Sequence, residues 1–326
     1  MGYCTTPARL PLRPHKGPGV AMGPEGSRKG LTPGAFEARA LGFIALGIVV
    51  LGLVFCLPPI PQPQSYHAFA DDRTMLGVPN FLNVASNLPF FVVGVLGLWL
   101  LLRQDAVGPN RPVLEAVERW PFLVFFAGVL LTGFGSSYYH FAPGNDRLVW
   151  DRLPMTLAFM GLFASMIGER IGVRAGAWLL WPLVWLGVVS VLSWHLGERC
   201  GAGDLRLYGF VQFYPLLTIP LLIWLFPARY THAGYVFVSL GWYLLAKGLE
   251  THFLDHAIYS AGRLVSGHTL KHLAAAASAF WLFLMVKYRW PAAVRQPAAA
   301  GPWTCCSEGC ECRGRTVGDV FHHHGH

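Results

Sequence analysis

Eight apolar runs, each about as long as the 17 to 25 residues that a membrane-spanning helix needs, constrain this chain more than any other feature. They cover approximately residues 40–57, 81–102, 121–139, 150–168, 176–194, 207–226, 234–250 and 267–287. Backbone amides in lipid must be paired within their own segment, so such runs form helices. The composition, 54% hydrophobic and 13% charged, agrees with this. The sequence therefore predicts an all-α membrane protein.

The first apolar run indicates a retained helix, because it starts after nearly 40 residues, precedes Pro-rich sequence and lacks a small-residue cleavage site. We expect a disordered basic tail over 1–38, an extra transmembrane helix over 39–58, a seven-helix core over 66–290 and a disordered Cys/His-rich tail over 297–326. The last tail contains "CCSEGCEC" and "FHHHGH". It has two interpretations, a metal-handling segment and a flexible tail with reduced thiols.

Most of the 25 lysines and arginines lie in the tails and in the second, fourth and sixth loops, on one side of an eight-span topology. By the positive-inside rule both termini are then cytoplasmic. The net charge of +8 follows from this bias, and neither a fold nor an aromatic platform for nucleic acid is recognisable. The Ala- and Gly-rich composition and the charge bias are compatible with a bacterial inner membrane, and no obligate protein partner is inferred.

Polar residues interrupt this oily chain in the stretch "GFGSSYYHFAPGNDRLVWDRLP", residues 133–154. Ser136 and His140 are four residues apart and share one face at the end of the third run, and Asp151 opens the fourth. The last run opens with "SGHTLKHL", in which His268 and His272 have the same spacing. An alternating topology places all five side chains on the extracytoplasmic side.

The types of these side chains indicate a catalytic metal. Three histidines that leave a fourth position open are typical of a catalytic zinc site, which lowers the pKa of bound water to about 7. Asp151 is then a candidate to accept the proton of that water. Ser136 is a candidate to hydrogen-bond the metal-bound water or the oxyanion of a tetrahedral intermediate. The pattern favours metal-assisted hydrolysis of a carbonyl substrate drawn from the membrane.

The stretch "ETHFLDH" has a second histidine pair at the same spacing, His252 and His256. It trails from the seventh run into a predicted loop and lies on the same side. These histidines could supply the ligands, cap the helix or line the entrance, and spacing alone does not separate the two pairs. A lone histidine inside a membrane is also often a packing residue.

Ser136-x3-His140, Asp151 and His268-x3-His272 resemble the signature of the CREST superfamily, which contains the alkaline ceramidases and the adiponectin-receptor-like proteins. The alkaline ceramidases are the most similar branch, because "PNFLNVASNLPF", 79–90, resembles their first core helix and "WDRLPM" the stretch after their catalytic loop. The resemblance covers roughly residues 66–287.

This resemblance implies a zinc amidase that hydrolyses ceramide, or a related N-acyl lipid of the membrane, to a fatty acid and a sphingoid base or amine. His140, His268 and His272 would bind zinc, Asp151 would act on the water, and Ser136 would assist at the metal. The preference for His268 and His272 over the other pair rests on the resemblance.

The segment "SYHAFADDRTMLGVPN" stands where the alkaline ceramidases have an acidic calcium-binding segment. Asp71 and Asp72 supply carboxylates, but Asn80 replaces a glutamate and the Trp-Cys-Glu stretch of the family is absent. Calcium takes six to eight oxygen ligands. Two interpretations stay open, a calcium site at these three residues and a solvated loop over the zinc site.

Two other classes of function are alternatives. A receptor of the adiponectin-receptor type would share the zinc site but should have the inverted orientation and loop motifs of that branch, which are not found. A transporter would carry polar residues along a path through the membrane, whereas here they gather at one side.

Overall fold

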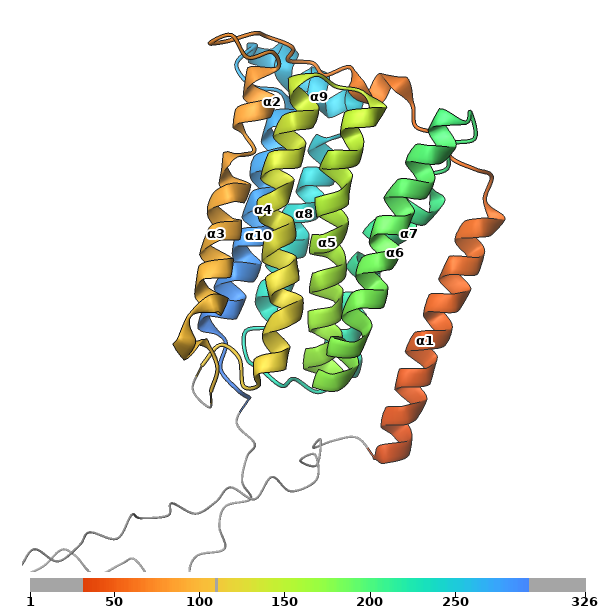
Figure 1. The fold of residues 1–326 in the computed structure, drawn as a ribbon, viewed down its shortest axis with the longest axis vertical. Helices are drawn as coiled ribbons and strands as arrows, with labels where there is room; N and C mark the ends of the chain where they lie inside the picture. The colour runs from red at the N-terminus through yellow and green to blue at the C-terminus, as the bar shows by residue number, and fades with distance from the viewer. Residues whose placement is uncertain (1–31, 109–110, 293–326) are drawn as a thin grey trace, which may run out of the picture. The chain divides into compact units, whose positions relative to one another are not determined.

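The computed structural model describes residues 32–108 and 111–292, which fold into helices and loops. Seven long helices form a bundle: α3 (Leu88–Leu102), α4 (Arg119–Phe141), α5 (Asn145–Arg170), α6 (Val173–Arg199), α7 (Arg206–Leu225), α8 (Gly234–Leu249) and α10 (Gly267–Tyr288). Helix α1 (Pro33–Cys56) precedes them, and the short helices α2 (Phe81–Ala85) and α9 (His252–Gly262) lie at one end (Figure 1). The predicted all-α membrane bundle is confirmed. Both predicted tail segments lie outside the described residues, apart from 32–38.

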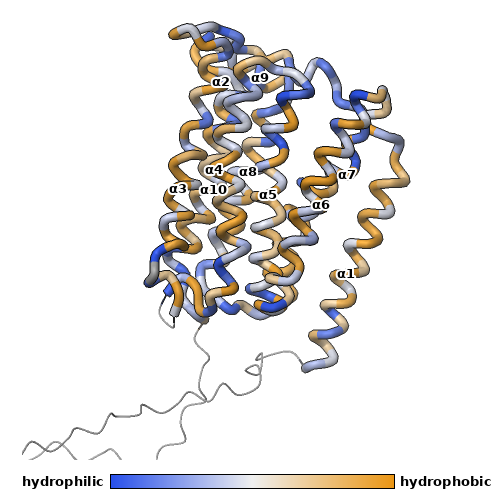
Figure 2. The backbone as a smooth tube through the Cα atoms, viewed as in Figure 1, coloured by the Kyte–Doolittle hydropathy of each residue, from blue (hydrophilic) through white to orange (hydrophobic). Residues whose placement is uncertain are grey.

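Among the described helices, six are long and apolar enough to span a membrane, and they include α1, α4, α6, α7 and α10. The sixth candidate, Phe81–Leu102, joins α2 and α3, which are separated only by Ser86 and Asn87. The other two predicted spans are also helical, but α8 has only 16 residues and α5 carries charged residues. Figure 2 shows hydrophobic residues along the helices and hydrophilic ones concentrated toward the ends of the bundle.

Helix α1 begins at Pro33, so the prediction of disorder up to residue 38 is wrong for its last residues. The side chain of Thr32 accepts a hydrogen bond from the Ala35 amide, and Pro33 occupies the first helical position, where its missing N–H costs nothing. The helix packs mainly against α7, and its one buried residue, Phe43, also contacts the Phe163 ring of α5. Most of its apolar side chains are exposed. It lies at the edge of the bundle, where the sequence predicts an extra helix.

Near the start of α1, Arg39 donates a hydrogen bond to the Leu225 carbonyl at the end of α7. Tyr230, which follows α7, pairs with Pro291 beyond α10. The start of α1 and the end of α10 therefore lie at the same end of the bundle, as the eight-span topology requires.

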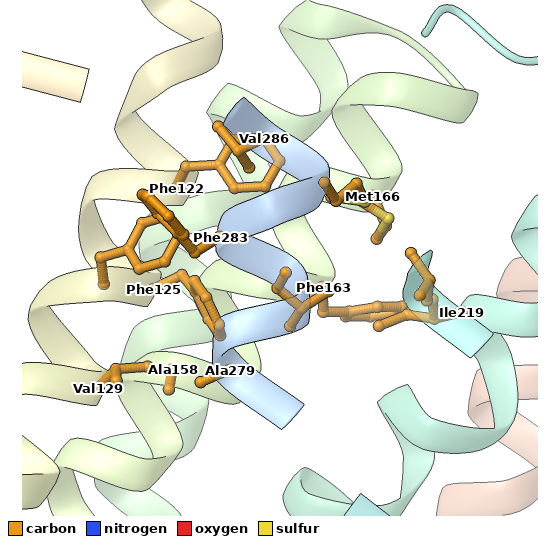
Figure 3. Close-up of a cluster of buried hydrophobic side chains, with 14 of the residues drawn as sticks. Phe122, Phe125, Val129, Ala158, Phe163, Met166, Ile219, Ala279, Phe283 and Val286 are labelled. Carbon is orange, nitrogen blue, oxygen red and sulfur yellow. The ribbon is translucent and has the colours of Figure 1, made fainter. Parts of the chain in front are cut away.

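The centre of the bundle is filled by phenylalanine and aliphatic side chains from α4, α5, α7 and α10, shown in Figure 3. Beside this core, α4 and α5 approach each other closely. A Cβ atom added at Gly135 would lie 1.8 Å from the Trp150 carbonyl oxygen, so only glycine permits the contact. Because Ser136 follows Gly135 and Asp151 follows Trp150, this contact sets the spacing of two predicted site residues.

Candidate metal centre

The structure brings His140, His268 and His272 together at the end of the bundle that also carries α2 and α9. His140 lies in the last turn of α4, and the other two lie in the first turns of α10. All three are buried, and one ring nitrogen from each lies within 4.8 Å of the others. His268 and His272 are four residues apart in α10, and the end of α4 places His140 next to them. The three side chains therefore form a group that could hold a metal ion.

The geometry of the nitrogens fits such an ion. The Nε2 atoms of His140 and His268 are 3.2 Å apart. Two ligands at about 2.0 to 2.1 Å from one tetrahedral ion stand about 3.3 Å apart. The Nε2 atom of His272 is buried and has no hydrogen-bond partner among the described residues, which would be costly unless a ligand satisfies it.

Ser86, between α2 and α3, holds the His272 ring from behind. Its Oγ atom lies 2.8 Å from His272 Nδ1, and both side chains are buried. This contact leaves Nε2 free to face the other histidines. Hydrogen bonds of this kind fix the ring orientation and tautomer of a metal ligand.

Two asparagines of the same stretch form hydrogen bonds with a ligand residue or with its neighbour in the chain. Asn80 Nδ2 donates to the His140 carbonyl at 2.9 Å. Asn83 Oδ1 accepts from Thr269 Oγ1 at 2.9 Å, next to His268. The sequence identified this Asn and Ser pattern only as part of a resemblance. The sequence feature that could have indicated their role is the presence of several polar residues within an otherwise apolar helical segment.

The segment after the seventh apolar run is predicted to be a loop, but it forms helix α9. Its Thr251 cap and amphipathic residues make it helical, and its Asp255 is buried. Asp255 accepts hydrogen bonds from the His268 amide at 2.7 Å and the Ala70 amide at 2.9 Å. This carboxylate thus fixes the first turn of α10. The sequence did not predict this role, because both amides that Asp255 binds lie outside its own helix.

His252 and His256 are not part of the three-histidine group. Their rings stack on each other with centroids 4.0 Å apart, and His256 Nδ1 contacts the His252 carbonyl at 3.0 Å. His252 is exposed. In contrast, the Phe69 ring packs on His140 and His268, at 4.7 and 4.5 Å between centroids, and covers them.

Ser136 and Asp151 are both buried. Together with His272 and Lys271 they line one end of a cavity between the helices. The rest of its wall is mostly apolar and includes Phe125, Val129 and Leu282. We call it the apolar cavity; its empty space is about 970 Å³, counting the part open to the outside.

A second space, the polar cavity, shares Asp151, Met155 and Lys271 with the apolar cavity. Arg152, Lys247 and Glu250 also line it, as does Tyr66. Glu250 accepts hydrogen bonds from Lys247 and from Lys271, the latter at 2.7 Å, and from the Tyr66 hydroxyl at 2.9 Å. Burial raises the pKa of Tyr66, which keeps its hydroxyl protonated as the donor.

The residues of the calcium interpretation have separate partners. Both carboxylate oxygens of Asp71 accept from the Arg73 guanidinium, at 2.7 and 2.8 Å. Asp72 is exposed, and Asn80 is engaged with His140. A calcium site at these residues stays a prediction.

Comparison with models of protein families finds no match, and comparison with curated proteins finds no significant match.

Proposed function

We propose that this membrane protein is a zinc-dependent amidase that hydrolyses the N-acyl bond of ceramide or a related N-acyl lipid. The observation that carries the proposal is a buried three-histidine group whose His272 lines the end of a long apolar cavity next to Asp151 and Ser136. Histidine nitrogens suit zinc, and three of them leave a position open for chemistry.

When bound there, zinc lowers the pKa of water to about 7 and polarises a carbonyl group. Asp151 takes the proton of the attacking water while the hydroxyl adds to the acyl carbon. The C–N bond then breaks, and the same proton passes to the departing nitrogen, which gives a fatty acid and an amine. Ser136, which lines the same end of the apolar cavity, orients the Asp151 carboxylate.

The apolar cavity suits the acyl chain. It follows α10 from His272 to Leu282, a helical rise on the order of 15 Å. Its lining offers few polar groups away from the histidines, so a hydrocarbon chain would enter it without leaving buried polar atoms unpaired. The carbonyl of a bound N-acyl lipid would then lie at the polar end of the cavity.

The test combines metal analysis with product release on the full chain in detergent or nanodiscs. We expect about one zinc per chain and release of fatty acid from N-acyl sphingolipids. His268→Ala should abolish both, whereas His252→Ala, which changes the stacked pair, should abolish neither. Absence of zinc, or unchanged fatty-acid release from His268→Ala, would contradict the proposal.

A further inference from the structure

The polar cavity contains a buried arginine that the proposed chemistry does not use. Arg152 follows Asp151 in α5 and is only 5% exposed. Its guanidinium lies over three aromatic rings, 4.2 Å from the centroid of Trp194, 4.7 Å from that of Tyr208 and 5.7 Å from that of Tyr66. Such a cage fixes the position of the group, which is therefore not a mobile surface charge.

The hydrogen bonds of Arg152 are incomplete. Nη2 donates to Gln62 Oε1 at 2.5 Å, a neutral acceptor. Nη1 is buried and has no hydrogen-bond partner in the described part of the chain. Among residues 32–108 and 111–292, no carboxylate oxygen lies within the 4.0 Å of an ion pair with Arg152. A buried, unpaired guanidinium donor is costly, so this geometry calls for an acceptor that enters from the cavity.

The neighbouring charges do not supply that acceptor. Glu250 is already shared by Lys247 and Lys271. Asp151 makes no ion pair with Arg152 among the described residues, and its side chain also lines the apolar cavity with Ser136 and Lys271. Three cationic side chains and two carboxylates line the polar cavity, so one positive charge is left without a counter-charge. We assign it to Arg152, because Arg152 has no ion-pair partner among the described residues.

We propose that the polar cavity binds the head group of the substrate, and that this head group carries an anionic group that pairs with Arg152. The inference rests on the proposed function, because it assigns the amine side of the amide to the polar cavity and the acyl side to the apolar cavity. The two cavities meet at Asp151, Met155 and Lys271, so an amide at this junction extends into both. Carboxylate, sulfonate and phosphate all have oxygens that guanidinium binds in bidentate fashion.

The first experiment needs no variant. Zinc-loaded protein in nanodiscs is given N-palmitoylglycine, N-palmitoyltaurine and N-palmitoyl-O-phosphoethanolamine, which carry the three anionic groups, and the neutral N-palmitoylethanolamine and ceramide. We expect kcat/KM to be about tenfold higher, or more, for at least one anionic substrate than for both neutral ones, since a hydrogen bond to a charged group has this effect. The arms of the panel identify which anion is preferred.

The second experiment tests Arg152 itself. Arg152→Gln should lower the ratio of kcat/KM for the preferred anionic substrate to that for N-palmitoylethanolamine by about tenfold or more. Arg152→Lys should retain part of the preference. The matched control is Arg147→Gln in the same helix, because Arg147 stacks on Tyr138, at 4.5 Å, and lines neither cavity.

Binding provides a readout that does not depend on turnover. Ketone isosteres, in which CH2 replaces the amide N–H, are titrated calorimetrically into the zinc-loaded protein, and the charged isostere should bind about tenfold tighter than the neutral one. Fatty-acid release without any preference for charge would overturn the head-group inference and leave the amidase proposal standing. Tighter binding of the charged isostere without fatty-acid release from any substrate would contradict the amidase proposal and support the head-group inference.

Discussion

The three histidines depend on residues that hold their rings as much as on their own positions. Ser86 is the clearest case, because its Oγ atom meets His272 Nδ1 and thereby leaves Nε2 for the metal. Asn80 acts on the His140 backbone in the same region. The stretch between residues 80 and 87 therefore positions two of the three ligands.

Ser86→Ala should weaken metal binding about 10- to 100-fold, because the His272 ring loses the contact that sets its orientation. The measurement is zinc affinity by competition with a chromophoric chelator. Ser137→Ala is the control, since the Ser137 hydroxyl donates to the Val84 carbonyl, at 3.4 Å, and touches none of the three histidines in the described part of the chain. Equal zinc affinities for Ser86→Ala and the unchanged protein would show that the contact does not tune the site.

At the scale of helices, the site depends on how closely α4 and α5 pack. Gly135 lies against the Trp150 carbonyl, and Gly128 and Gly161 make similarly close contacts between the same two helices. Small residues let helix backbones approach in a membrane protein, where packing replaces the hydrophobic effect as the main attraction between helices. Bulk at these positions would move His140 and Ser136 away from Asp151.

Gly135→Ala should separate the two helices and destabilise the bundle by about 1 to 3 kcal/mol or more, the usual cost of overpacking. Thermal unfolding in detergent gives the stability, and zinc content gives the state of the site; both should fall. Gly241→Ala in α8 is the control, because an added Cβ there meets nothing within 4 Å. A Gly135→Ala protein with the unfolding temperature of the control would refute the tight contact.

At the scale of the whole molecule, the start of α1 and the end of α10 share one end of the bundle, and the histidines lie near the other. The distribution of lysine and arginine leads us to propose that the end where α1 begins and α10 ends is cytoplasmic and that the histidines face the extracytoplasmic side of a bacterial inner membrane.

We therefore expect a reporter that is active only in the cytoplasm to be active when fused after His326, and inactive when inserted at Gly201, in the exposed turn between α6 and α7. The alternating topology puts these two positions on opposite sides. The opposite pattern of activity would invert the orientation and place the histidine site on the cytoplasmic side.

Several features of this protein could be predicted from the sequence because they depend on local patterns. The lengths of apolar runs indicated the helices, and the four-residue spacing of His268 and His272 put both rings on one face of α10. The alternation of spans predicted that His140 would lie at the same end. The His252 and His256 pair had the same spacing, and only the fold separated it from the three-histidine group.

The tertiary structure alone decided how these histidines are held and what lies beside them. Ser86 and His272 are 186 residues apart in the chain, and no local pattern pairs a serine with one histidine among several. The capping of α10 by Asp255 and the missing partner of Arg152 likewise depend on which helices become neighbours. Helix formation follows from the residues of one segment, whereas a hydrogen bond or an unpaired charge is defined only once distant segments have packed.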